Sequence, residues 1–321
     1  MRLERLDRRG RVAMEAALRA GEPVLLDLER PPPIGVRLDE IVPLCHDVVA
    51  WDDALTLSLR ALLPPPARPG HGARVTAVVP THRRTPLGLT ALRGQDVEVE
   101  VLVLANGPAR PEGDRVVRVP WEGHGRTRQR GVELATGEYV LFTVDDALPC
   151  GAGFVRTLVE AIEEGSFDAV YARQVPWPTS DPVTRDRLRA WTPPGRCVVE
   201  GAHLDHVAAL HRRATLLAHP LPDVPIAEDL HWGRGRRVGY VPTAPVAHAH
   251  RRTPGALWRR TLAVHREHLA LGEAPRIPTS GALLGALPGI VGPVLAAGPR
   301  EVPNQVAELL AQYAAARRGA S

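Results

Sequence analysis

Short apolar runs alternate with amphipathic stretches from about residue 73 onward. Residues 74–80 (RVTAVVP), 97–104 (VEVEVLVL) and 139–144 (YVLFTV) are rich in β-branched or aromatic side chains, as is typical of buried strands. The same reasoning predicts short strands at 116–119 and 169–172, and helical spacing of apolar residues predicts helices over 87–93, 126–135 and 154–164. This alternation predicts an α/β fold with a mostly parallel central sheet covered on both faces.

Ligands of such sheets bind beyond the carboxyl ends of the strands. The rule directs attention to residues 80–84, 105–108 and 145–147, which follow the three longest predicted strands. We therefore expect the functional site to be built from these three loops.

Proline clusters divide the chain before this pattern begins. PPP at 31–33 and PPPARPGHG at 64–72 interrupt regular structure, since proline fixes the backbone and lacks an N–H donor. We treat residues 1–70 as an N-terminal extension, with a helix expected over 11–20 and a strand over 23–28.

The C-terminal region, residues 253–321, follows the main domain at 73–252. Amphipathic patterns predict helices over 255–271 and 302–317. These helices are expected to pack against the main domain or to form a homodimer contact.

Composition narrows the class of partner and compartment. The net charge is only +4 and no long basic run alternates with aromatic residues, so nucleic acid is not an expected partner. The three cysteines share no metal-ligand spacing and are expected to be reduced thiols. The N-terminal residues hold no apolar run of the secretory kind, and we expect a cytoplasmic protein.

One uncharged segment complicates that expectation. GALLGALPGIVGPVLAAG, at 281–298, reaches the lower limit of a membrane-spanning length, but Pro288, Pro293 and several glycines interrupt it. A soluble helix pair or loop is favoured, with peripheral contact to the inner face of a membrane as the alternative.

Two adjacent carboxylates, Asp145 and Asp146, follow the strand predicted at 139–144. Adjacent acids at the end of a buried strand repel each other and lose hydration unless a cation lies there. A divalent cation held by one carboxylate and by diphosphate oxygens removes this conflict and withdraws charge from a phosphate leaving group. The alternative is that Asp146 caps the following helix, or that both acids are solvated in a turn.

A second acidic pair, Glu228 and Asp229, begins another predicted helix after a proline-rich loop. Acids in a first helical turn complement the helix dipole and need no function. The functional hypothesis is that one of these carboxylates acts as a general base on a hydroxyl group.

Two histidines, His248 and His250, alternate within the stretch VAHAH. In an extended chain both imidazoles face the same side, and one could complete the coordination shell of a metal. A chance pair is an equally good explanation in a chain with 13 histidines. We assign the remaining candidates to the core or surface: His203, His206, His211, His219 and His231.

Together these features resemble the family 2 glycosyltransferases, which have the GT-A fold. VTAVVPTHRR is similar to the family's opening strand and nucleotide loop, VEVLVLANGP to its second strand and turn, and GRTRQRGVELATGEYVLFTVDDA to its helix, strand and acidic motif. IAEDLHWGRGRRVGYVPTAPVAHAH is similar to its acidic-pair helix, next strand and histidine, and the arginines that follow resemble the rhamnosyltransferase-like branch. The resemblance spans 75–250 and implies a catalytic domain at 73–252.

The resemblance also implies an activity and a set of roles. It implies inverting transfer of a sugar from a nucleotide-diphosphate donor to a hydroxyl acceptor (a glycan, a lipid-linked molecule or a small molecule), assisted by Mn²⁺ or Mg²⁺. Asp229 would be the catalytic base with Glu228 beside it, and Asp146 and His248 would bind the metal. The donor would lie against Pro80, Thr81, Arg83, Asn106, Arg128 and Asp145.

Two positions depart from the family pattern. Ala105 stands where the family usually has the acid that contacts the base, and Asn106 would take over part of that role because an amide both donates and accepts. Val144 stands in place of the first acid of the acidic motif. The identity of the nucleotide therefore stays open.

Two other hypotheses use a similar fold. A sugar nucleotidyltransferase typically has a glycine-rich basic loop after the first strand, whereas PTHRRTP at 80–86 contains arginines but no glycine. A non-catalytic sugar- or partner-binding protein would fit the two departures, but the retained Asp146, Asp229 and His248 argue against it.

Overall fold

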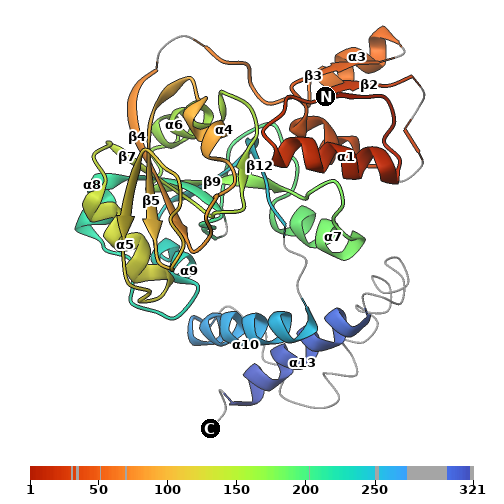
Figure 1. The fold of residues 1–321 in the computed structure, drawn as a ribbon. Helices are drawn as coiled ribbons and strands as arrows, with labels where there is room; N and C mark the ends of the chain where they lie inside the picture. The colour runs from red at the N-terminus through yellow and green to blue at the C-terminus, as the bar shows by residue number, and fades with distance from the viewer. Residues whose placement is uncertain are drawn as a thin grey trace.

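The computed structural model describes residues 1–29, 32–33, 36–50, 52–68, 71–201, 203–249, 253–272 and 302–318. His250 and the apolar segment at 281–298 lie outside these residues. Figure 1 shows three parts: a large α/β domain, a small N-terminal α/β module beside it, and a pair of C-terminal helices below.

The α/β domain is built on a nine-stranded sheet. Its strands are β4 (His71–Thr81), β5 (Val97–Ala105), β6 (Arg115–Arg118), β7 (Tyr139–Thr143), β8 (Leu148–Pro149), β9 (Ala169–Val175), β10 (Val199–Glu200), β11 (Ala208–Arg212) and β12 (Val238–Ala247). The order is β10-β12-β9-β11-β7-β4-β5-β6, with β8 paired to β12. Strands β4, β5, β6, β7, β9 and β12 run in one direction, and β11 lies antiparallel between β7 and β9. The predicted mostly parallel sheet is confirmed.

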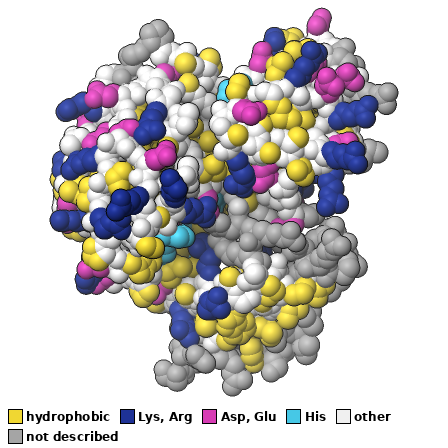
Figure 2. Space-filling view, in the orientation of Figure 1, with side chains coloured by type: hydrophobic (Ala, Val, Ile, Leu, Met, Phe, Trp, Pro, Cys, Tyr) yellow, Lys and Arg dark blue, Asp and Glu magenta, His cyan; other side chains and the backbone are white. Residues whose placement is uncertain are grey.

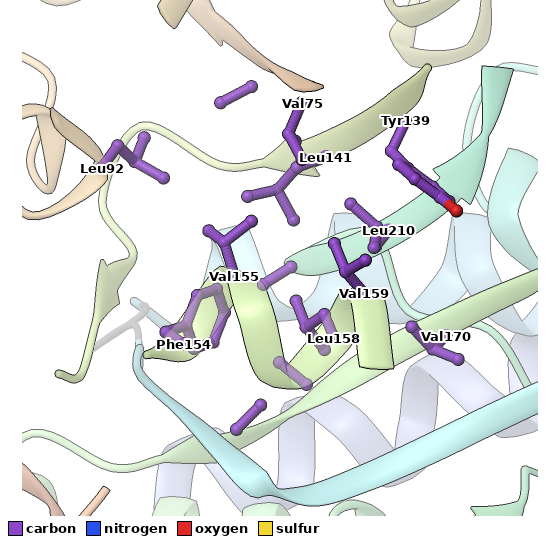
Figure 3. Packing of buried hydrophobic residues seen from close by; sticks show 14 of the residues in the cluster. Val75, Leu92, Tyr139, Leu141, Phe154, Val155, Leu158, Val159, Val170 and Leu210 are labelled. Atoms are coloured by element: carbon purple, nitrogen blue, oxygen red, sulfur yellow. The ribbon is translucent and has the colours of Figure 1, made fainter. Parts of the chain in front are cut away.

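Helices cover both faces of this sheet. On one face lie α4 (Leu89–Arg93) and α6 (Phe154–Glu164), and on the other α5 (His124–Leu134), α8 (Arg213–Ala218) and α9 (Glu228–Gly233). Because side chains alternate along a strand, Val75 packs with α6 on one face while Val78 packs with α5 on the other. Figure 3 shows Phe154 and Leu158 of α6 packed among the strand residues.

The N-terminal extension is a folded module. Three parallel strands, β1 (Arg2–Leu3), β2 (Leu25–Asp27) and β3 (Asp47–Val49), pair in chain order. They are accompanied by α1 (Arg8–Arg19), α2 (Leu38–Ile41), the 3₁₀ helix η1 (Val42–Leu44) and α3 (Asp53–Arg60). Its core residues share one cluster with Cys150, Val175, Trp177 and Ala247 of the α/β domain. The module is therefore continuous with the large domain through a common hydrophobic core.

Ion pairs join the module to α7 (Pro182–Trp191), which follows β9 and precedes β10 in the chain. Arg185 Nη1 lies 2.6 Å from Glu40 Oε2, and Arg189 Nη2 lies 2.7 Å from Asp39 Oδ2. Asp181 caps the start of α7 by accepting a 2.8 Å hydrogen bond from Thr184 N. Helix α7 is thus held at its first turn and along its length.

The C-terminal helices α10 (Pro254–Ala270) and α13 (Val302–Arg318) match the two helices predicted there and pack on each other. Helix α10 also meets the large domain, where His231 Nε2 of α9 lies 2.9 Å from Glu267 Oε2. Of the helices within the described residues, none is both long enough and apolar enough to cross a bilayer.

Candidate active site

A cleft of about 680 Å³ opens beyond the carboxyl ends of β4, β5 and β7, where the strand pattern places it. It brings together every residue to which the sequence analysis assigned a role: Pro80, Thr81, Arg83, Asn106, Arg128, Asp145, Asp146, Glu228, Asp229 and His248. Segments that are more than 160 residues apart in the chain therefore converge on one cavity.

The first acidic pair shares one neighbouring arginine, whose single positive charge offsets half of the charge of the two carboxylates. Arg83 lies between the two carboxylates, with Nε 3.4 Å from Asp145 Oδ2 and Nη2 3.3 Å from Asp146 Oδ2. Thr81 Oγ1 donates a 2.7 Å hydrogen bond to Asp145 Oδ2 and accepts one of 2.9 Å from Arg83 N. The capping alternative does not apply to Asp146, because α6 begins at Phe154 after Gly153 and has no side-chain cap.

A glycine fixes the loop that follows β4 against this acidic pair. Leu87 N donates a 2.7 Å hydrogen bond to Asp145 O. Gly88 then has φ +84°, and a Cβ at this position would lie 2.5 Å from Ala147 O. Only glycine combines this backbone conformation with so close an approach, so the loop holding Arg83 is tightly positioned.

His248, which directly follows β12, has a hydrogen-bond partner that sets its tautomer. Gln174 Nε2 donates a 2.5 Å hydrogen bond to Asp205 Oδ2, and a carboxylate can only accept. The amide oxygen of Gln174 therefore faces His248, whose Nδ1 donates to it at 2.9 Å. The proton on Nδ1 leaves Nε2 directed toward Asp146 Oδ1, 3.6 Å away.

This arrangement fits a divalent cation held between Asp146 and His248. Two ligand atoms that each lie about 2.1 Å from the same cation are roughly 3.0–3.5 Å apart, close to the 3.6 Å between Asp146 Oδ1 and His248 Nε2. The observed separation is too long for an N–H···O hydrogen bond. A partner on the second ring nitrogen, here Gln174, is the usual support of a ligating histidine. Across the described ranges, no three His, Cys, Asp or Glu side chains form a metal cluster. Two protein ligands are typical where phosphate and water supply the rest.

Glu228, at the start of α9, is buried in an ionic network. Its Oε1 lies 2.5 Å from Arg128 Nη1 and 3.3 Å from His206 Nδ1. Burial opposes ionisation of Glu228, but the charge of Arg128 and the hydrogen bond with His206 outweigh it and hold the pKa of this carboxyl far below its usual value. Glu228 is therefore a fixed negative charge in the wall of the cleft.

Asp229, the next residue, differs from Glu228 in its surroundings. Its carboxylate accepts two backbone hydrogen bonds, from His206 N (3.1 Å) and from Leu230 N (2.9 Å). Burial, reinforced by the charge of Glu228, raises the pKa of Asp229, although the imidazole of His206 acts in the opposite direction. A carboxylate of raised pKa is a stronger proton acceptor, as a general base requires.

The turn that presents this acidic pair is strained. Ala227 has φ 64° and ψ 31°, the left-handed conformation that non-glycine residues rarely adopt. Such a conformation costs about 1–2 kcal/mol and is over-represented at functional sites. Ala227 directly precedes Glu228 and Asp229, so this backbone conformation sets where α9 begins and where both carboxylates enter the cleft.

Some residues of this cleft carry no signal in the sequence. His206, which the sequence places in the core or at the surface, lines the cavity and contacts Glu228. Its Nε2 lies 3.1 Å from Nε2 of His211, which is fully buried and whose pKa burial lowers well below 6.5. Neither histidine has neighbours in the sequence that signal a site.

Helix α10 supplies a further wall of the cleft. Arg260, Val264 and His268 line it from this helix. Figure 2 shows arginine, acidic and histidine side chains gathered where the α/β domain faces the C-terminal helices. The C-terminal region therefore takes part in the site.

Similarity to known proteins is found at the level of the fold. The sequence matches no protein-family model and no curated protein. The structure is similar to a mannosyltransferase from Pyrobaculum calidifontis in complex with GDP-mannose and Mn²⁺, with a TM-score of 0.52 at 18% identity over 78% of this chain and 88% of that chain. A second solved structure, S. aureus TarS residues 1–349, has a TM-score of 0.44 at 13% identity over 77% of this chain and 92% of that chain.

The similarity to the mannosyltransferase identifies the fold. The chain has the α/β architecture of GT-A-type glycosyltransferases, as the sequence resemblance implied.

Proposed function

We propose that this protein is an inverting glycosyltransferase that moves a sugar from a nucleotide-diphosphate donor to a hydroxyl acceptor with the help of a divalent cation. The observation that carries the proposal is that one cleft of a GT-A fold holds both the Asp146–His248 pair and the Asp229 carboxylate. The first can hold a cation beside a diphosphate, and the second can accept a proton.

The donor is assigned to the end of the cleft formed by β4 and β5. Pro80, Thr81 and Asn106 lie where a nucleoside would rest, and Asp145 is held toward it by Thr81. Arg83, which pairs with both acids, can turn to the diphosphate once a cation neutralises Asp146. Arg128 lines the same cleft while it fixes Glu228.

The transfer step is assigned to Asp229. Its carboxylate removes the proton of the acceptor hydroxyl as that oxygen forms a bond to the anomeric carbon, on the face opposite the diphosphate. The bond from the anomeric carbon to the diphosphate oxygen breaks in the same displacement, so the configuration inverts. A divalent cation at Asp146 and His248 would supply electrostatic stabilisation of the leaving diphosphate.

Several finer assignments belong to this proposal. The catalytic domain is assigned to 73–252, and the enzyme to a hexosyltransferase of the family 2 type with a cytoplasmic location, as the sequence resemblance implies. The mannosyltransferase was solved with GDP-mannose and Mn²⁺, which makes GDP-sugars and Mn²⁺ the first choices for a screen beside UDP- and dTDP-sugars.

Thermal shift with nucleotides tests donor binding. We expect GDP, UDP or dTDP, or one of their sugars, to raise the melting temperature in the presence of Mn²⁺ and to have a much smaller effect with EDTA. Mn²⁺-independent stabilisation would remove the metal from the proposal. A complete lack of response and of donor hydrolysis across the three nucleotide series would rule the proposal out.

A further inference from the structure

Trp191, the last residue of α7, is an exposed aromatic side chain in the wall of the cleft. It is 39% exposed, although its indole is among the largest apolar groups in the chain. Leaving such a surface in water is unfavourable, and an exposed aromatic ring inside a concave site commonly marks a ligand contact.

The indole is held in one orientation. Its Nε1 donates a 2.8 Å hydrogen bond to Asp205 Oδ2, and the ring of His203 stacks on it with centroids 3.6 Å apart and planes 27° apart. The next residue, Thr192, is buried, and its Oγ1 lies 3.2 Å from both N and O of Gln174 on β9. Since His203 covers one face, the exposed part of the ring is the other face and the edge.

The contacts of α7 with the N-terminal module hold this helix from the far side. Arg185 pairs with the buried Glu40, and Arg189 pairs with Asp39. These ion pairs fix the position of the helix that carries Trp191, so the indole is preorganised for a ligand.

Trp191 lies on the Asp229 side of the cleft. Asp205, its hydrogen-bond partner, directly precedes His206, whose backbone N–H donates to Asp229. Arg83 and Asp145, to which the donor is assigned, line the same cleft beyond β4 and β7. An acceptor that presents a hydroxyl to Asp229 therefore passes the indole and the carboxylate of Asp205.

The chemistry of this wall selects among acceptors. The indole offers an apolar face. Asp205 already accepts two hydrogen bonds on Oδ2, from Trp191 and Gln174, and one on Oδ1, from Val207 N, so Oδ1 retains one lone-pair site for a hydroxyl donor. A sugar ring has an apolar C–H face and a rim of hydroxyls that match both features. The negative charge of Asp205 disfavours phosphate or carboxylate beside the indole.

The geometry points to Trp191 and Asp205 as the subsite for the sugar ring of a neutral glycoside acceptor, stacked on the indole with its hydroxyl directed at Asp229. This inference rests on the proposed function and names its acceptor class. A planar phenol would also cover the indole, but it has no rim of hydroxyls for Asp205.

Acceptor kinetics test the subsite with the nucleotide sugar that the wild type hydrolyses. The acceptors are the methyl glycosides of mannose, glucose, galactose and rhamnose, with p-nitrophenol and undecyl phosphate as the non-sugar classes. We expect transfer to at least one methyl glycoside, and a roughly tenfold rise in its KM for Trp191→Ala. The KM of the nucleotide sugar should change far less than the acceptor KM in this variant, because the donor is assigned to the ends of β4 and β5.

Two further variants keep the test decisive. Trp191→Phe retains an aromatic face and should restore most of the acceptor affinity, while Trp191→Leu replaces Trp191→Ala if the latter does not fold. The subsite would be overturned by an unchanged acceptor KM in Trp191→Ala or Trp191→Leu, or by transfer only to p-nitrophenol or undecyl phosphate. In either case, hydrolysis of the nucleotide sugar by the wild type would still support the proposed function. Absence of hydrolysis of any nucleotide sugar by the wild type would overturn both.

Discussion

Gln174 Oε1 accepts a 2.9 Å hydrogen bond from Nδ1 of His248, and this contact leaves Nε2 of the imidazole directed at Asp146. The same amide donates to Asp205, which in turn accepts from the indole of Trp191. One buried side chain on β9 thus links the proposed cation ligands to the proposed acceptor subsite.

Replacing Gln174 by methionine should weaken the cation site. Methionine keeps the length of the side chain but cannot accept from His248, so the imidazole loses its orientation. We expect Mn²⁺ affinity in the presence of a nucleotide diphosphate to fall about 10–100-fold, measured by titration of free Mn²⁺. Thr192→Val is the matched control, because the hydroxyl that it removes contacts the backbone N and O of Gln174 and not its amide group; this variant should bind Mn²⁺ as the wild type does.

Asp146→Asn should abolish metal-dependent donor binding. The substitution keeps the size of the side chain but removes the charge that a divalent cation requires. In a thermal-shift titration, the stabilisation by nucleotide should become the same with Mn²⁺ and with EDTA. A full Mn²⁺ response in this variant would mean that the cation binds elsewhere.

Glu228→Gln should destabilise the fold. The substitution leaves Arg128 charged and buried without a counter-ion, which costs about 3–5 kcal/mol in measured cases. Chemical denaturation gives the change in unfolding free energy. The exposed pair Arg130–Glu133, on the same helix as Arg128, is the control, since Arg130→Ala should change stability by less than about 0.5 kcal/mol.

His211 should make the protein sensitive to mild acid. Burial holds its folded-state pKa well below 6.5, so the unfolded chain binds a proton that the folded protein does not as the pH falls below 6.5. This contribution to stability is complete above pH 6.5 and is lost progressively below it. The melting temperature should fall less steeply from pH 6.5 to roughly pH 5 in His211→Gln than in the wild type. Parallel curves for the two proteins would contradict this assignment.

Much of the central sheet and of the cleft could be predicted from local patterns. Residues 97–104 and 139–144 correspond to β5 and β7, and the helix predicted at 154–164 coincides with α6. The rule that ligands bind at the carboxyl ends of parallel strands then brings Pro80, Asn106 and Asp145 to one edge. These inferences succeed because strand periodicity and sheet polarity are local properties.

The parts that escaped prediction depend on distant contacts. In the N-terminal module, the helix predicted over 11–20 and the strand predicted over 23–28 correspond to α1 and β2. Strands β1 and β3 are two and three residues long and carry no periodic signal, so only their pairing and the shared core define them. Gln174 lies in a fully buried strand, where a polar residue is unusual, but its partners His248 and Asp205 are brought to it only by the fold. The same applies to His206, whose contacts with Glu228 and Asp229 span more than 20 residues.

Comparison of Asp229→Asn with the wild type is the most direct test of the account. Asparagine keeps the size of the side chain and can accept one of the two backbone hydrogen bonds, from His206 N or Leu230 N, but it is not a base at neutral pH. With a methyl glycoside acceptor and the preferred nucleotide sugar, transfer should fall about 10²–10⁴-fold while the Kd of the donor in the presence of Mn²⁺ stays unchanged. Transfer at the wild-type rate in Asp229→Asn would contradict the assignment of this carboxylate as the base, and with it the proposed mechanism.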